Sequence, residues 1–361
     1  MRLLPITRAH GLQLARDIPA ADPRQMPLLR AGAKLTDGYV KGLGDAGIHA
    51  IWVHDSLTEG IEPRDLVPPH VREEAARQVS NALDKAGREF DRRSLLSRDL
   101  RVDLAAIVDK IVRAVADNGD TALVLSDLAT ADAYTHQHSI DVCALGILLG
   151  RTMFLRDGWI DFKGRRRVDG IHRRIHQLGL GLLLHDIGKI AVPGHILNKP
   201  GPLTAEEQEV MRTHPDVGGQ MLQSSFYSPL VRAIVREHHE RWDGQGYPHG
   251  LGGSSISQLA RIAAVADVYD AVTSERPYKA AQPAHVGVQV ILEGSGTAFD
   301  PEVVEVFRGL VLPYPVGVEI RLADGTAGVV AHVEPSDPHR PLVRFPSGER
   351  VVDLDEERLA A

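Results

Sequence analysis

The feature that most constrains this chain is a run of seven residues, all Leu or Gly, that ends in a His-Asp pair. Residues 178–184 read LGLGLLL, and the motif HDIGK follows at 185–189. A carboxylate beside so apolar a segment is unfavourable to bury unless it is paired or binds a metal. Imidazole and carboxylate groups both suit a divalent cation. A structural histidine beside an aspartate that caps a helix would give the same letters, so this fragment alone leaves both alternatives open.

The charge balance and the single cysteine argue against several classes of protein. Among 361 residues, 41 are Lys or Arg and 48 are Asp or Glu, so the net charge is −7. This balance argues against binding to nucleic acid polymers or anionic membranes. Cys143 is the only cysteine, which excludes an intramolecular disulfide and a cysteine-based zinc site.

The apolar segments of the chain give no sign of membrane insertion or export. No uninterrupted apolar run approaches the length of about 18 residues that a membrane span requires. The N-terminal segment is interrupted by Pro5, Arg8 and His10, so it does not have the pattern of a signal peptide. We therefore expect a cytoplasmic protein.

Changes of pattern along the chain predict several domains, since single cores rarely grow beyond about 250–300 residues. Residues 1–69, rich in Gly, Pro and short apolar pairs, predict a small α+β module for regulation or docking. Residues 70–99 form a polar, Ala-rich linker helix that allows dimerisation, and residues 100–312 have helical spacing throughout. Residues 313–361 alternate as short strands and predict a small β-barrel-like module. The fold class is mainly α: an all-α bundle with two small flanking modules.

A basic stretch interrupts the helical pattern at residues 156–176, which include the run RRRVDGIHRRIH. The simpler interpretation is a solvated surface loop. The alternative is a basic flap that helps to attract an anionic substrate.

Further histidines and an aspartate lie at the ends or in the cores of other predicted helices. They are His138, His214, His238, His239 and Asp267. Each histidine taken alone is more often structural than a ligand. Gathered in one helical bundle with His185 and Asp186, they favour a metal centre, because bundle interiors bring such ligands together from several helices.

These motifs resemble the HD superfamily of metal phosphohydrolases, and in particular its HD-GYP subgroup. The matching segments are HDIGK at 185–189, His214-Pro215, HHERWDGQGYP at 238–248 and TSERPYK at 273–279. The resemblance covers about residues 100–307 and implies an HD-type helical bundle. It also implies hydrolysis of cyclic di-GMP, a bacterial second messenger, either to pGpG or onward to GMP, by a metal-bridging hydroxide.

The resemblance further implies a set of ligands for two divalent metal ions, with Fe or Mn as the expected identity. One metal would be held by His138, His185, Asp186 and Asp267. Asp186 would bridge to a second metal, completed by His214, His238 and His239. Some family members add a glutamate one helical turn before the first histidine, which supports a third metal. Here that position is Tyr134, so two metals are expected.

The remaining motif residues are expected to act on the substrate. Lys189 and Asp186 are the predicted catalytic residues: the Lys189 ammonium would stabilise charge on the phosphate or the hydroxide, unless it only offsets a helix dipole. The loop residues predicted to bind substrate are Gly246, Tyr247 and Pro248, with Tyr247 either beside a guanine or part of a structural turn. By resemblance, Arg276 and Lys279 contact the phosphates; solvated charges are the alternative.

Two other functions remain open at this point. One is a non-catalytic module that binds cyclic di-GMP or a partner protein, and the other is an HD hydrolase of a different cyclic dinucleotide. Apart from cyclic di-GMP, the expected partners are a second copy of the chain through the linker helix and signalling proteins through the N-terminal module or the GYP loop.

Overall fold

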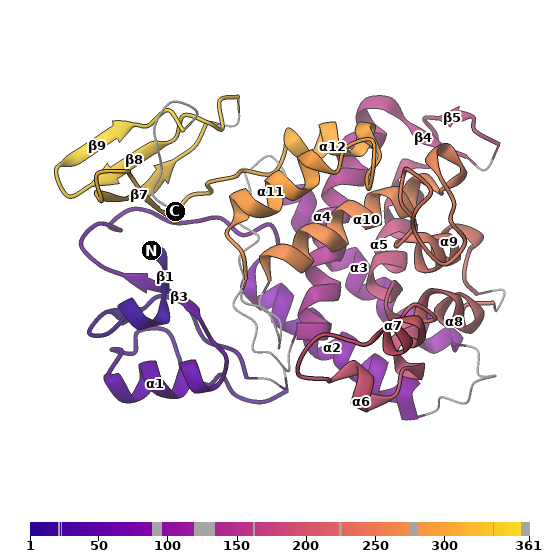
Figure 1. Ribbon diagram of the computed structural model, residues 1–361, viewed down its shortest axis with the longest axis horizontal. Helices are drawn as coiled ribbons and strands as arrows, with labels where there is room; N and C mark the ends of the chain where they lie inside the picture. The colour runs from indigo at the N-terminus through magenta and orange to yellow at the C-terminus, as the bar shows by residue number, and fades with distance from the viewer. Residues whose placement is uncertain are drawn as a thin grey trace.

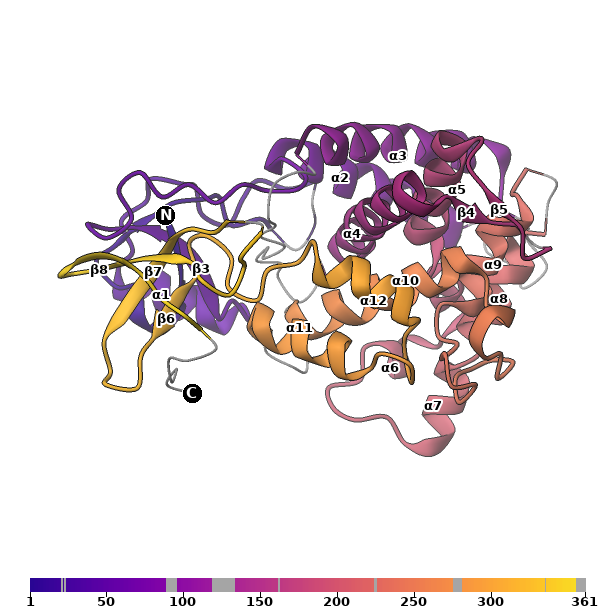
Figure 2. The same ribbon diagram turned by 90° about the horizontal axis from the view of Figure 1, so that it is seen from above.

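The computed structural model describes residues 1–20, 22, 24–88, 96–118, 134–161, 163–223, 226–274, 281–334 and 336–354, without the side chains of residues 86, 88 and 134–136. The chain forms a large helical body and a smaller β-rich body that lie side by side (Figures 1 and 2). The β-rich body contains both the first and the last described residues, whereas the helical body is built from the middle of the chain.

The helical body is organised around α4, which packs on both α5 and α10. Its helices are α2 (Pro69–Arg88), α3 (Arg98–Asn118), α4 (Tyr134–Asp157), α5 (Ile171–Leu184), α6 (Gly194–Leu197), α7 (Ala205–Met211), α8 (His214–Met221), α9 (Pro229–Glu237), α10 (Gln258–Thr273), α11 (Ala284–Glu293) and α12 (Pro301–Arg308), with the 3-10 turns η2 (Ile187–Ala191) and η3 (Gly253–Ser255). One continuous apolar core joins these helices, apart from α6, α7 and η3, which contribute no residue to it. The segment Gln137–Asp157 is long and apolar enough to span a membrane, but 83% of its 18-residue apolar window is buried inside the protein.

The Leu-Gly run forms the last two turns of α5, and close packing of helices explains its glycines. A methyl group at Gly181 would lie 2.3 Å from Cδ1 of Ile234 on α9, and one at Gly179 would lie 2.7 Å from Cγ1 of Val108 on α3. The leucines of the run are buried in the core. The glycines therefore let two helices approach α5, and this approach brings the end of α5 into the middle of the body.

Helix α2 is an integral part of the helical body. The sequence predicted a linker helix over residues 70–99, and the described part of that segment is helical to Arg88. Ala75, Ala76, Val79 and Ala82 belong to the same apolar core as α3 and α4. Arg72 pairs with Asp141 of α4 at 2.8 Å, with both side chains almost fully buried. The apolar face expected to serve dimerisation is thus covered by the chain itself, and a homodimer stays a prediction.

The described residues of the β-rich body form two sheets, one α-helix and the short 3-10 turn η1 (Ile6–Arg8). Strands β1 (Arg2–Pro5), β3 (Ala50–His54) and β2 (Gln13–Leu14) form an antiparallel sheet with helix α1 (Asp37–Asp45) beside it. The second sheet has the order β6 (Glu319–Arg321), β7 (Ala327–His332), β8 (Leu342–Phe345) and β9 (Gly348–Val351). The C-terminal module was expected to be barrel-like, but the described strands form a four-stranded antiparallel sheet without barrel closure.

The two terminal modules contact each other directly. The Leu3 backbone N–H donates to the Gly317 carbonyl at 3.0 Å. The guanidinium groups of Arg2 and Arg8 reach the carboxylate of Glu319 at 2.9 and 2.6 Å. The sequence predicted two separate flanking modules, whereas the structure joins them into one body at one end of the molecule (Figure 2).

In its described residues, the basic insertion (156–176) contains the end of α4, two small strands and the first residues of α5. Strands β4 (Trp159–Ile160) and β5 (Arg166–Arg167) make a hairpin after α4, in which Arg165 pairs with Asp161 at 2.8 Å and Arg167 with Asp169 at 2.9 Å. The charges of the hairpin are therefore largely paired within it, as expected for a surface element.

Candidate metal centre

Seven side chains from five segments of the helical body converge on one point. They are His138 on α4, His185 and Asp186 at the end of α5, His214 at the start of α8, His238 and His239 at the end of α9, and Asp267 on α10. Except for His239, whose side chain is one-quarter exposed, all of these side chains are almost fully buried. The structure thus brings together every residue for which the sequence predicted a role as metal ligand. We call these seven residues the metal centre.

Backbone carbonyls orient three of the imidazoles. Nδ1 of His185 lies 2.7 Å from the Leu182 carbonyl, Nδ1 of His214 lies 2.8 Å from the Met211 carbonyl, and Nδ1 of His238 lies 3.0 Å from the Val235 carbonyl. A carbonyl can only accept, so each Nδ1 carries the proton and donates it. In the neutral ring, Nε2 is then a lone pair directed into the centre. Metal-ligating histidines are commonly oriented by a hydrogen bond of this kind.

The imidazoles face one another in two pairs. Nε2 of His214 and Nε2 of His238 are 3.3 Å apart, and Nε2 of His185 and Nε2 of His138 are 3.2 Å apart. Burial lowers the pKa of His214 and, together with the neighbouring His239, lowers that of His238 far below the usual range. Two neutral rings with opposed lone pairs repel, so a cation between His214 and His238 is the arrangement that stabilises them.

Asp186 lies between the two pairs. Its Oδ1 is 3.3 Å from Nε2 of His214, and its Oδ2 is 3.3 Å from Nε2 of His185. Oδ1 is buried and accepts no hydrogen bond from any residue that the structure describes. Burial would raise the pKa of Asp186, but the charge of Lys189 and the neighbouring imidazole of His185 outweigh it and hold the pKa well below the usual range. An ionised, unsatisfied carboxylate oxygen beside two imidazole lone pairs fits a metal ligand.

Asp267 and Asp270, on one face of α10, hold His138. Oδ1 of Asp267 is 3.2 Å from Nε2 of His138, and Oδ2 of Asp270 is 2.6 Å from its Nδ1. Burial would lower the pKa of His138, but hydrogen bonds to these two aspartates outweigh it and raise the pKa to about 9. The ring thus occupies a place where positive charge is favoured. Ser274 in turn donates to Oδ1 of Asp270 at 2.9 Å.

Sequence reasoning missed Asp270. The signal was its spacing of three residues from Asp267, which places both carboxylates on one side of a helix. The sequence gives no sign that Asp270 would meet His138, 132 positions away.

We expect Asp270→Ala to weaken metal binding about 10- to 100-fold, the usual effect of removing a carboxylate that orients a ligating histidine. The measurement is competition for Mn²⁺ between the protein and a fluorescent chelator. Asp103→Ala, an exposed carboxylate on α3, is the matched control and should bind Mn²⁺ like the wild type. Equal affinities for Asp270→Ala and wild type would show that His138 does not need this orientation.

The loop between α9 and α10 supports His239 from outside the centre. Glu240 is buried and accepts the backbone N–H groups of His249 and Leu251 at 2.7 and 2.9 Å. A methyl group at Gly246 would lie 2.4 Å from the Arg241 backbone nitrogen, so only glycine fits there. The Tyr247 ring stacks on His239 with centroids 4.7 Å apart, and the Tyr247–Pro248 peptide bond is cis. The loop is thus a packed turn with its tyrosine on a metal-centre histidine.

A pocket of about 500 Å³ opens beside the metal centre. We call it the α2 pocket, because Leu83, Asp84 and Gly87 of α2 form one side. The other side comes from Ser139, Leu183, Asp186, Ile187, Lys189, Ile190 and Leu197. Asp186 and Lys189 connect this pocket to the metal centre, so it is where a ligand of the metals would lie.

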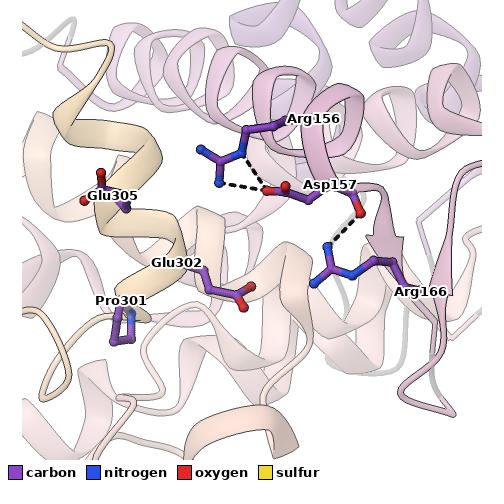
Figure 3. A pocket seen from close by; sticks show the side chains of 6 residues that line it. All are labelled: Arg156, Asp157, Arg166, Pro301, Glu302 and Glu305. Atoms are coloured by element: carbon purple, nitrogen blue, oxygen red, sulfur yellow. Dashed lines mark hydrogen bonds and ion pairs between the residues drawn. The ribbon is translucent and has the colours of Figure 1, made fainter.

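A second pocket of about 550 Å³ lies at the opposite end of α4, and Figure 3 shows the side chains that line it. Arg156 pairs with Asp157 there, and Arg166 of the basic hairpin donates to the Asp157 carbonyl at 2.7 Å. His138 and Arg156 are 18 residues apart on α4, which corresponds to about 27 Å. The basic insertion therefore does not cover the metal centre, and the alternative of a substrate-attracting flap lacks support.

Three predicted residues cannot be placed. Arg276 and Lys279, predicted to contact phosphates, lie outside the described residues, as does the side chain of Tyr134.

The family model and the known proteins that this chain resembles agree with one another. Residues 168–303 match the model of the HD domain family. The chain is 42% identical over 257 residues to a cyclic di-GMP phosphodiesterase of Pseudomonas aeruginosa, covering 69% of this chain and 58% of that protein. It is 41% identical over 158 residues to a cyclic di-GMP phosphodiesterase of Thermotoga maritima, covering 43% of each. The chain thus spans little more than half of the length of the first of these relatives.

Among solved structures, an HDG"Y"P protein of Bdellovibrio bacteriovorus has a similar fold. The TM-score is 0.51 over 84% of this chain and 97% of that chain, with 16% sequence identity. At this identity the likeness concerns the fold alone.

Proposed function

From the match of residues 168–303 to the HD domain family, we propose that the chain is a metal-dependent phosphodiesterase that hydrolyses cyclic di-GMP to pGpG. The relatives named for this activity, at 41–42% identity, support the substrate. The observation that carries the reaction type is the metal centre: two opposed imidazole pairs with the unsatisfied carboxylate of Asp186 between them.

Two divalent ions fit this arrangement. His138, His185, Asp186 and Asp267 would hold one, and Asp186, His214, His238 and His239 would hold the other. Imidazole and carboxylate ligands without a thiolate suit Fe or Mn. When bound, a pair of cations supplies Lewis-acid stabilisation of phosphoryl oxygens and lowers the pKa of a water molecule. The seven side chains contribute a largely buried ligand set, in which carbonyls of α5, α7 and α9 orient the rings of His185, His214 and His238.

We propose that Lys189 acts on the substrate phosphate. Its Nζ is 2.5 Å from Oδ2 of Asp186, its side chain is one-third exposed, and it lines the α2 pocket. It lies in the short 3-10 turn η2, past the end of α5, so a role as a helix-terminal cation explains it poorly. A fixed ammonium beside the metals would stabilise the charge that develops on a phosphate oxygen.

The roles of the GYP loop and of the basic residues after α10 follow from the resemblance. Gly246, Tyr247 and Pro248 place an aromatic ring on His239 at the edge of the centre, where a guanine could also pack. Arg276 and Lys279 remain predicted phosphate contacts, and the position of Tyr134 supports two metals rather than three. Partner proteins, a homodimer and a cytoplasmic location also remain proposals.

The test is turnover by the full chain purified with Fe²⁺ or Mn²⁺, depleted with a chelator and then reloaded. We expect about two metal ions per chain, cleavage of cyclic di-GMP to pGpG, loss of activity on depletion and recovery on reloading. A metal-loaded protein that binds cyclic di-GMP without cleaving it would be a binding module. A clear preference for another cyclic dinucleotide in the same assay would replace the substrate.

A further inference from the structure

The end of the basic insertion contains two histidines that the proposed reaction does not use. His172 and His176 lie one turn apart in the first half of α5. Their spacing of four residues places both rings on one face of the helix, and two histidines at this spacing can hold one zinc ion together. His176 and His185 are nine positions apart in the chain, about 14 Å along a helix. The pair is therefore separate from the metal centre.

The two rings converge at their Nε2 atoms. Nε2 of His172 lies 3.3 Å from Nε2 of His176, whereas the ring centroids are 4.3 Å apart, so the rings lean toward each other on the Nε2 side. In a tetrahedral zinc site with Zn–N bonds of about 2.0–2.1 Å, two nitrogen ligands are about 3.3–3.4 Å apart. The observed separation thus matches two corners of such a site.

A carboxylate from a neighbouring helix orients one of the two rings. Oδ1 of Asp109 on α3 lies 2.8 Å from Nδ1 of His176. An ionised carboxylate only accepts hydrogen bonds, so Nδ1 carries the proton and donates it. Burial outweighs the charge of Asp109 and lowers the pKa of His176, which keeps the ring neutral and leaves a lone pair on Nε2. A carboxylate behind a histidine in this way is a common means of orienting a zinc ligand.

The surroundings of the pair determine how firmly a cation is held. The positive end of the α5 dipole and the neighbouring Arg173 oppose binding, whereas Asp109 favours it. No third His, Cys, Asp or Glu side chain in the part of the chain that the structure describes completes a ligand group with the pair. Water then fills the other two positions, because the His172 side chain faces solvent. Such a site fills and empties with the free zinc concentration, unlike a closed structural site with four protein ligands.

We propose that His172 and His176 form a second metal site, which binds Zn²⁺ at the surface of the helical body, and that Asp109 is a positioning residue that orients His176. The ion fixes the ring that ties the start of α5 to α3. Because α5 leads directly into His185 and Asp186, zinc stabilises the helix that presents two side chains of the metal centre. The inference does not depend on the proposed reaction.

The test counts metal ions in the full chain, first loaded with Mn²⁺ and then equilibrated with micromolar free Zn²⁺. Zn²⁺ generally binds such ligands more tightly than Mn²⁺ and can replace it in the metal centre, so the measure is the sum of both metals, which replacement leaves unchanged. We expect wild type to hold one ion per chain more than His172→Ala or His176→Ala. Asp109→Ala should weaken binding of this ion about 10- to 100-fold.

A matched control removes a different exposed histidine. His332 pairs with Glu334 at 2.9 Å on the surface of the β-rich body, so His332→Ala removes an imidazole beside a carboxylate elsewhere in the chain. This variant should keep the wild-type sum of metals.

Chemical modification of wild type tests the same site without any substitution, so it decides the inference even where a variant fails to fold. Diethyl pyrocarbonate modifies the unprotonated nitrogen of exposed histidines, and mass spectrometry locates the modified residues. Zn²⁺ should protect His172 and His176 at a concentration at which His332 still reacts.

An additional ion in wild type, together with protection of His172, supports the inference. Equal sums of metals in wild type and both histidine variants, with His172 equally reactive in the presence and absence of Zn²⁺, would overturn it. The short distance between the rings would then be a hydrogen bond that Nε2–H of His172 donates to Nε2 of His176. Wild-type zinc affinity in Asp109→Ala would overturn the role of Asp109.

Discussion

Asp186→Ala is expected to lose both metal binding and hydrolysis of cyclic di-GMP. The two oxygens of Asp186 face different imidazole pairs, Oδ1 toward His214 and Oδ2 toward His185, so the substitution removes a ligand from both proposed metals. Loss of metal-ion catalysis corresponds to several kcal/mol of transition-state stabilisation, which lowers kcat/KM about a thousandfold or more. Metal content by elemental analysis and turnover of cyclic di-GMP are the two measurements.

A matched pair of variants distinguishes loss of ligation from loss of the fold. Asp186→Asn keeps the shape of the side chain but removes its charge, and it should lose most of the metal as well. Asp216→Asn changes a half-exposed carboxylate on α8 that pairs with Arg236, outside the ligand set, and should keep metal and activity. Thermal unfolding of each variant checks that the helical body remains folded. Full activity in Asp186→Ala would rule out the assignment of Asp186 as the bridging ligand.

The ligand set could be predicted because its members follow a pattern along the chain. Each histidine stands at a helix end or opens an apolar helix, and the order of the motifs resembles the HD-GYP family. The hydrogen bonds that orient the rings could not be predicted, because they use backbone carbonyls such as those of Leu182 and Val235. A carbonyl is present at every position, so it leaves no mark in the sequence.

The packing of α2 within the helical body was harder to predict than the fact that the segment is helical. Its buried face is made of Ala75, Ala76, Val79 and Ala82, mostly small residues, so the apolar period is faint and the helix looks like a polar linker. Small side chains are also what allows α2 to approach α3 and α4 closely. The place of Asp84 in the lining of the α2 pocket depends on this packing, and no local pattern predicts it.

Sequence patterns likewise could not predict that the N-terminal and C-terminal modules contact each other. Alternation predicted strands after residue 313, and four were found. The ion pairs between Arg2 and Arg8 and Glu319 join residues more than 300 positions apart. Propensity and periodicity report on local structure, so they divide a chain into modules without saying which modules meet.

Gly188→Ala is expected to disrupt the half of the metal centre to which α8 contributes His214. A methyl group at Gly188 would lie 1.9 Å from the His214 carbonyl oxygen and 2.7 Å from the Gly218 backbone nitrogen. Backbone atoms cannot rotate away as a flexible side chain can, so α8 must shift as a whole. Overpacking of this kind typically lowers the free energy of unfolding by about 1–3 kcal/mol. The shift also carries His214 away from His238 and Asp186.

The glycine of the HDIGK motif thus has a structural reason: it lets the turn after Asp186 touch the start of α8, where His214 lies. Because His138, His185 and Asp267 come from α4, α5 and α10, Gly188→Ala should retain about one metal per chain where wild type holds two. A positional error of about 1 Å can lower turnover about a hundredfold, and we expect a loss of at least that size. Gly194→Ala is the matched control, since a methyl group there meets no described atom within 4 Å. Wild-type metal content and turnover in Gly188→Ala would mean that α8 adjusts without moving His214, and that the contact with η2 does not place this ligand.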